Sequence, residues 1–292
     1  MDGVIVVDKP EGWTSHDVVN KVRRLAGTKA GHLGTLDPIA TGVLPLVLGK
    51  ATRLAQFYTR SGKIYEALVR FGWSTTTYDR AGEATSEKRE VALTAPDLEV
   101  HLERFRGEFL QTPPPVSAKK VDGKRAYQLA RQSIAVELEP VQVQVYELEL
   151  LEVNGALARM RAHCSGGTYM RSIAHDLGQA MGCGAHLEQL RRTLSGEFEM
   201  EMARTIPQLQ QLIIDERLVD ALVPAVNLLP GFPTVYVDDL TVAQIRNGRN
   251  FPASPFRSDP ASKYVKAVSR QGELVAIGEA VLPNLYHPAV VL

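Results

Sequence analysis

Apolar and polar residues alternate along several stretches of the chain, which is the pattern of half-buried β-strands. In Ile64–Phe71 the alternation places four apolar side chains, Tyr65 among them, on one face. A continuous apolar run at Val4–Val7 predicts a fully buried strand. Further strands are predicted at Val141–Val153, Leu157–His163 and Ser195–Met200.

Apolar residues three and four positions apart predict helices between these strands. The first helix begins at a cap formed by Thr14 or Ser15 and ends at Gly27. Other helices are predicted at Gly49–Thr59, after caps at Thr94 and Thr168, and at Leu187–Arg192, Pro207–Leu212 and Asp215–Leu222.

The composition changes at Leu229-Pro230-Gly231, where we expect a linker. After it the chain predicts strands at Phe232–Val237, Lys263–Val268 and Leu274–Ala280, a helix at Leu240–Arg246 and a Gly/Pro/Ser-rich loop at 247–262. We therefore expect two domains, residues 1–228 and residues 229–292.

The stretch Gly31–Pro45 fits neither a helix nor a strand, because it holds three glycines and two prolines. It still carries apolar residues that would anchor it to a core, so it predicts an ordered loop. Its acid is Asp37, followed by Pro38. The pair is typical of a helix start, with Asp37 as the cap, but an ordered loop also suits a reactive carboxylate. The pattern alone leaves both interpretations open.

The charges are balanced but segregated. The 292 residues include 33 basic and 33 acidic side chains, so the net charge is zero. Arg104–Arg131 holds seven basic and two acidic residues, whereas Glu137–Glu152 holds five glutamates and no basic residue. Such segregation allows a basic face on a neutral protein, as contact with a phosphate backbone requires.

Two cysteines, Cys164 and Cys183, do not make a disulfide framework. The first ten residues have no basic leader and only a short apolar run, which predicts neither a signal peptide nor a membrane span. We expect a cytoplasmic protein.

Two short motifs suggest other chemistry, and neither is favoured. His163-Cys164 with Cys183-x-x-His186 offers four zinc ligand types, but adjacent ligands chelate poorly in a structural site. Gly49-Lys50 resembles part of a phosphate-binding loop, but lacks both the glycine five residues earlier and a Ser or Thr directly after the lysine.

Three motifs together resemble the TruB family, the bacterial tRNA pseudouridine-55 synthases. The longest is Gly31-His32-x-Gly34-Thr35-Leu36-Asp37-Pro38-x-Ala40-Thr41-Gly42-Val43-Leu44-Pro45, and the others are Asp8-Lys9-Pro10-x-Gly12 and Cys164-Ser165-x-Gly167-Thr168-Tyr169-x-Arg171. The resemblance implies the α/β pseudouridine synthase fold, with a mixed and mainly antiparallel sheet. It also implies a small PUA-like β-barrel that binds RNA at residues 229–292.

The implied reaction is the isomerisation of uridine to pseudouridine, at uridine 55 in the T-loop of tRNA. It breaks the bond from C1′ to N1 and joins C5 to C1′, so it calls for a carboxylate and for no metal or redox cofactor. The rival hypothesis is a non-catalytic RNA-binding or tRNA-folding protein on the same fold. The presence of Asp37, Tyr65 and Arg171 favours the enzyme.

The resemblance makes Asp37 the catalytic carboxylate and Arg171 its partner. Arg171 falls in the first turn of a predicted helix, where a cation opposes the helix dipole, and this position suggests a carboxylate nearby. Tyr65 matches the tyrosine that stacks on the target uracil and is a candidate to take the C5 proton. From the residues alone, Arg171 also fits a surface arginine and Tyr65 a core tyrosine.

Other matched positions are candidates for binding the substrate. Tyr169 and Leu190 match pocket-lining residues, although both also fit a core. His32 matches a histidine that stacks against the displaced nucleotide. Lys9, in the opening motif, is a fourth candidate.

The basic segment 117–131 resembles the family's thumb, which closes on the T-arm of tRNA. We expect a loop or hairpin there, leading into a short helix. Its candidates for phosphate contacts are Lys119, Lys120, Lys124 and Arg125. The expected partner is the T-arm stem-loop of tRNA, bound by a monomer.

Overall fold

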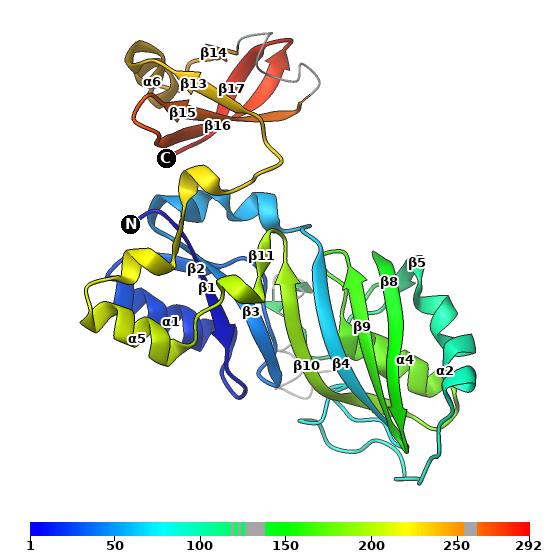
Figure 1. The fold of residues 1–292 in the computed structure, drawn as a ribbon. Coiled ribbons are helices and arrows are strands. Elements are labelled where there is room, and N and C mark those ends of the chain that lie inside the picture. The colour runs from blue at the N-terminus through cyan, green and yellow to red at the C-terminus, as the bar shows by residue number, and fades with distance from the viewer. Residues whose placement is uncertain (118–119, 122–123, 126–137, 254–261) are drawn as a thin grey trace.

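The chain forms two β-sheets with helices packed against them in a computed structural model that describes residues 1–117, 120–121, 124–125, 138–253 and 262–292 (Figure 1). The first sheet has ten strands. They are β1 (Gly3–Lys9), β2 (Ala30–His32), β3 (Ala40–Leu48), β4 (Lys63–Phe71), β5 (Gly107–Gln111), β8 (Val141–Asn154), β9 (Leu157–Cys164), β10 (Ala185–Ser195), β11 (Phe198–Glu199) and β12 (Leu222–Pro224).

The strands run in the order β12-β1-β3-β10-β4-β9-β8-β5, with β2 added to β3 and β11 to β10. Within the described chain, β3 and β10 are the one parallel pair of this sheet. The expectation of a mixed, mainly antiparallel sheet is therefore confirmed. The parallel pair brings the loop of residues 33–39 before β3, called the signature loop below, next to β10 and β4.

Helices cover the sheet at both ends in Figure 1, with α1 and α5 beside β1, and α2 and α4 beside β8 and β5. The α-helices are α1 (Ser15–Ala26), α2 (Ala95–Leu102), α4 (Met170–Ala180), α5 (Ile206–Ile214) and α6 (Asp239–Arg246). The 3-10 helices are η1 (Gly49–Tyr58), η2 (Glu103–Phe105), η3 (Met200–Met202), η4 (Leu218–Ala221) and η5 (Ala225–Asn227).

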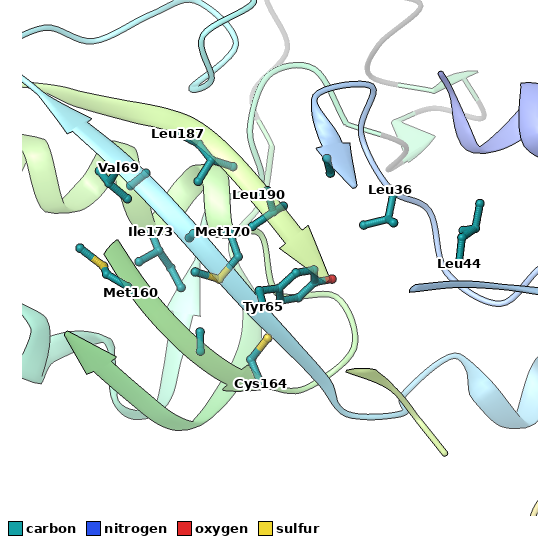
Figure 2. Packing of buried hydrophobic residues seen from close by; sticks show 14 of the residues in the cluster. Leu36, Leu44, Tyr65, Val69, Met160, Cys164, Met170, Ile173, Leu187 and Leu190 are labelled. Carbon is teal, nitrogen blue, oxygen red and sulfur yellow. The ribbon is translucent and has the colours of Figure 1, made fainter. Parts of the chain in front are cut away.

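Local sequence signals explain where α1 begins and ends. Thr14 and Asp17 form a capping box, and Gly27 ends the helix in the left-handed conformation at φ 62°. Such reciprocal bonds satisfy two of the backbone N–H groups that a helix start leaves open. On β4, the alternation predicted from the sequence buries Tyr65 and its same-face neighbours against α4 (Figure 2).

The helix predicted at Leu187–Arg192 is wrong, because these residues lie in β10. Leu187 pairs with Val69 of β4 and Leu190 with Ala67, and a register shift between them leaves Glu188 without a partner on β4. This β-bulge puts residues three apart on the same face of a strand. The spacing therefore imitates a helix.

The stretch 31–45 is a loop only over 33–39, since strands β2 and β3 take in its two ends. Asp37 is not a helix cap: its carbonyl accepts from the N–H of Ala40 at 3.0 Å in a turn, and β3 follows. The cap predicted at Thr168 is also wrong. α4 begins one residue later, after Tyr169, which makes no side-chain cap bond.

The second sheet is curled and has the order β13-β15-β16-β17-β14 (Figure 1). Its strands are β13 (Thr234–Val237), β14 (Phe251–Pro252), β15 (Tyr264–Ser269), β16 (Leu274–Leu282) and β17 (Leu285–Val291). Val268 and Ile277 of this sheet share an apolar cluster with Val4 and Val6 of β1, so the two sheets pack together. The sequence did not predict β17, because Pro288 interrupts its pattern.

The basic segment forms the expected hairpin at its start, with β6 (Lys120–Val121) paired to β7 (Lys124–Arg125). Lys119 and the predicted helix lie outside the described residues.

Candidate active site

A pocket of about 340 Å³ opens between the signature loop, the start of β4 and the start of α4. Six of the site residues expected from the sequence line it. They are His32, Asp37, Tyr65, Tyr169, Arg171 and Leu190. The fold therefore gathers positions that lie up to 158 residues apart in the sequence, as the span from His32 to Leu190 shows.

The loop that carries Asp37 is anchored on both sides. Leu33 and Leu36 are buried, and the Ser15 hydroxyl both accepts from the N–H of Leu36 at 2.8 Å and donates to its carbonyl at 2.9 Å. The Asp37 side chain itself keeps 34% of its surface exposed. A fixed backbone under a solvent-accessible carboxylate is what a reactive acid needs.

Arg171 reaches Asp37 from the first turn of α4. Its Nη2 donates to Asp37 Oδ1 at 3.1 Å, and its Nε lies 2.9 Å from Oδ2 as an ion-pair contact outside hydrogen-bond geometry. The side chain is only 5% exposed. Nη1 donates to the carbonyl of Thr77 at 3.1 Å, and Nη2 also donates to that of Val116 at 2.9 Å. The guanidinium is therefore fixed around the carboxylate.

Asp79 is a second carboxylate beside Arg171, and the sequence did not single it out. Its buried Oδ2 lies 3.8 Å from Arg171 Nη1, while Oδ1 accepts from the Thr77 hydroxyl at 2.6 Å. Tyr78, which lies between Thr77 and Asp79 in the sequence, has φ 63°, a strained value for a bulky residue. Its ring stacks on that of His175 of α4, with 3.7 Å between the ring centroids. The turn thus holds two acceptors against Arg171. Nothing periodic in the polar run of residues 75–79 could have revealed it.

Tyr65 forms part of the pocket floor. Burial raises the pKa of its hydroxyl, and the Arg192 guanidinium acts against that rise. In Figure 2 the ring lies near Leu190 and Cys164, with the hydroxyl pointing away from the Val69 end of the core. Tyr65 is thus a core residue at one edge and lines the pocket at the other, and its role toward the base stays a prediction.

Arg192, which sequence reasoning also missed, is fully buried opposite Tyr65 on β10. Its Nε donates to the carbonyl of Val43 at 2.7 Å and its Nη2 to that of Gly34 at 3.0 Å. These contacts connect the signature loop and the adjoining strand β3 to β10. The only sequence signal was a second arginine beside Arg191.

Apolar walls and a backbone clamp complete the pocket. Leu190 is largely buried, and burial raises the pKa of the Tyr169 hydroxyl. The Gln111 side chain holds the backbone of Tyr169, accepting from its N–H at 2.8 Å and donating to its carbonyl at 3.1 Å. At the mouth, His32 Nδ1 accepts from the N–H of Gly34 at 3.4 Å.

Lys9 does not line the pocket, contrary to its expected role as a substrate contact. It is fully buried, and its Nζ donates to the carbonyls of Ala40 at 2.7 Å, Pro10 at 2.9 Å and Pro38 at 3.3 Å. With three acceptors satisfied inside the protein, the ammonium has no free face for RNA. We interpret Lys9 as a residue that holds the turn at Asp37.

The stability of the protein is expected to rise with pH through the titration of Lys9. Burial lowers its pKa from 10.5 to about 8. Between about pH 8 and about pH 10.5 the unfolded chain therefore binds more protons, and the free energy of unfolding rises by on the order of 3 kcal/mol. Chemical denaturation of parent and Lys9→Met at about pH 7.5 and about pH 10 measures this rise.

The Lys9→Met variant should lose this part of the rise. Lys63, whose pKa burial likewise lowers to about 8, contributes a second rise that the variant keeps. An identical pH dependence in both proteins would contradict the assignment.

Two family models match the chain. The model of the TruB family pseudouridylate synthase N-terminal domain matches residues 22–170, and that of the tRNA pseudouridylate synthase B C-terminal domain matches residues 171–229. The chain belongs to the TruB family of pseudouridylate synthases. The family models cover Asp37, Tyr65 and Arg171, and stop where the linker was expected, near residue 229.

Known members of the family resemble the chain along its length. The tRNA pseudouridine synthase B of Solibacter usitatus (strain Ellin6076) is 76% identical over 293 residues, all of both chains. That of Aquifex aeolicus (strain VF5) is 42% identical over 252 residues, 85% of this chain and 86% of that protein. Among solved structures, a Cbf5-Nop10-Gar1 complex contains a chain with a TM-score of 0.71 and 31% identity, covering 97% of this chain and 79% of that one.

No three His, Cys, Asp or Glu side chains of the described segments are grouped so that they could hold a metal ion. The described helices are all too short or too polar to cross a membrane.

Proposed function

We propose that the protein isomerises uridine to pseudouridine in tRNA, at uridine 55 of the T-loop. The observation that carries the proposal is the Asp37 carboxylate, partly exposed in a pocket and fixed by the buried Arg171. Relatives named tRNA pseudouridine synthase B support tRNA as the substrate. Mapping pseudouridine in tRNA from cells with and without the gene tests both substrate and position.

The reaction conserves all atoms of the base and sugar. The N1–C1′ bond breaks, the uracil turns, C5 bonds to C1′, C5 loses its proton, and N1 gains one. Asp37 can serve as a nucleophile toward C1′ or C6, or as a base toward a sugar proton. In each role its carboxylate must be ionised and close to the nucleoside, and the Arg171 ion pair supports both conditions.

The apolar walls suit the detached uracil. Tyr65 offers a ring face for stacking, and Leu190 and Tyr169 exclude water around it. A uridine must leave its stack to enter such a pocket, which costs a few kcal/mol. Tyr65 is the proposed acceptor of the C5 proton, as a phenolate that has first given its own proton to another group, such as N1 of the uracil, which must gain one. The cationic Arg192 across the strand pair would favour the ionised tyrosine.

A basic hairpin supports tRNA as the partner. Replacing Lys119, Lys120, Lys124 and Arg125 with Ala should weaken tRNA binding at low salt and flatten the slope of log K against log salt by roughly one to three units. The reason is that each phosphate neutralised in duplex RNA contributes a slope of about −0.9, and less in single strands. A salt titration of the quadruple variant beside its parent measures the change. Equal affinity and slope would mean that the segment is merely solvated.

A non-catalytic RNA-binding or tRNA-folding protein is the alternative. It would need the RNA contacts but not the Asp37–Arg171 pair, whose buried guanidinium has no evident folding role that an apolar residue could not fill. Pseudouridine formed by the purified protein in a tRNA transcript decides between the two.

We further propose that residues 1–228 form the catalytic domain and residues 229–292 a second, PUA-like RNA-binding domain. We also propose a cytoplasmic location, which fits the free cysteines Cys164 and Cys183, and a monomeric state. Sedimentation measures the oligomeric state, and truncation after residue 228 measures the contribution of the second domain to tRNA affinity.

A further inference from the structure

One end of the pocket is cationic and lacks a counter-ion. Lys63 lines the pocket although it is only 7% exposed, and the fully buried Arg192 lies beside it. A Cβ built on Gly34 would lie 3.3 Å from Lys63 Cε and 3.5 Å from Arg192 Nη1, so both side chains approach the same point of the loop. Among the described residues neither cation has a carboxylate within 4.0 Å.

The two cations differ in how well they are satisfied. Arg192 donates to carbonyls of the loop and of β3. The Lys63 ammonium has three donors, but its one hydrogen bond within the described chain goes to the carbonyl of Ser61 at 3.0 Å. Burying like charges side by side without an anion is costly. The free protein therefore carries an arrangement that becomes favourable only when an anion enters the pocket.

The position of Lys63 indicates which anion this is. Lys63 and Tyr65 lie on the same face of β4, two residues apart, so their Cα atoms are about 7 Å apart along the strand. The carboxylate of Asp37 makes no ion pair with Lys63 and is already paired with Arg171. A uridine extruded into the pocket would carry its two phosphodiester groups at comparable distances from its base.

We propose that Lys63 binds a phosphodiester group of the RNA, one of the two phosphates that flank the uridine held in the pocket. The inference rests on the proposed function, since it takes RNA as the ligand. It gives Lys63 a binding role at the site. A lowered pKa supports this binding role. Burial, together with the nearby Arg192, lowers the pKa of Lys63 to about 8, so the charged ammonium is unfavourable in the free protein.

The test uses a short hairpin RNA with the reactive uridine in its loop. In further copies one flanking phosphate is replaced with an uncharged methylphosphonate. Each methylphosphonate RNA has a matched control with the same sugars and an ordinary phosphate at that position. Where the adjacent 2′-hydroxyl would cleave the methylphosphonate, both RNAs carry a 2′-deoxy sugar. Binding is measured for the parent, Lys63→Gln, and Lys88→Gln, which alters an exposed lysine over Trp73, away from the pocket.

Lys63→Gln should bind the ordinary hairpin about tenfold to a hundredfold more weakly than the parent, as the loss of a charge-assisted hydrogen bond predicts. For Lys63→Gln the slope of log K against log salt should become less steep by about 0.7 to 0.9. One of the two methylphosphonates should weaken RNA binding by the parent by a similar factor and leave RNA binding by Lys63→Gln unchanged. Lys88→Gln should respond like the parent.

Without RNA, Lys63→Met should melt at the same temperature as the parent or higher below pH 8, because it removes an unpaired buried charge. If Lys63 instead stabilised the fold, Lys63→Met would melt at a lower temperature than the parent. The inference would be overturned if the methylphosphonates weakened RNA binding by the parent and by Lys63→Gln equally, or weakened neither, although the parent still formed pseudouridine in the hairpin. A parent that neither binds nor converts the hairpin would overturn the proposed function as well.

Discussion

Replacing Asp37 with asparagine is expected to abolish pseudouridine formation while the fold and RNA binding persist. Loss of a group that attacks or deprotonates the substrate lowers the rate on the order of a thousandfold or more. Asparagine keeps the size of the side chain, and the Asp37 backbone turn does not depend on the carboxylate. Arg171 retains its contacts to Thr77, Val116 and Asp79.

The measurement is tritium release from RNA labelled at C5 of uridine, with tRNA affinity and melting temperature recorded in parallel. Asp215→Asn, at an exposed aspartate that ends α5, is the matched control and should behave like the parent. If Asp37→Asn lost activity only in proportion to unfolded protein, the carboxylate would be structural and the assignment wrong.

The sequence predicted about half of the strands of the first sheet: a continuous apolar run marked β1, alternation marked β4, β8 and β9, and a further predicted strand overlaps β11. It gave no strand at β2, β3, β5, β10 or β12. It failed where the backbone departs from a simple period. The bulge at Glu188 gave β10 the spacing of a helix, and Pro288 hid β17. Local patterns carry no information on register shifts, which the partner strand imposes.

The site was predictable where residues belong to one continuous motif, and less so where the fold brings separate segments together. Asp37 and Arg171 came from motif resemblance, and the structure pairs them. Asp79 and Arg192 were missed, since their role depends on three-dimensional neighbours that no spacing records. Lys9 shows the opposite error: a matched position is buried under the loop and makes no pocket surface.

Arg171→Lys is expected to lower the rate of isomerisation on the order of a hundredfold or more. The loss comes from geometry, because a lysine ammonium keeps the charge but cannot replace a planar guanidinium that meets Asp37, Thr77 and Val116 together. The Arg171 side chain is 5% exposed, so water has little access to the position that the guanidinium would leave. Asp37 would lose its fixed position, and kcat should therefore fall more than substrate affinity.

The matched control is Arg70→Lys, which alters a more exposed arginine paired with Glu188 at 3.0 Å. Exposed pairs contribute about 0–1 kcal/mol, so this variant should keep nearly parental activity. Single-turnover kinetics on tRNA, with the folded fraction measured by near-UV circular dichroism, separate a loss of catalysis from a loss of fold. A fully folded Arg171→Lys with parental rates would show that charge alone, and no planar contact, positions the carboxylate.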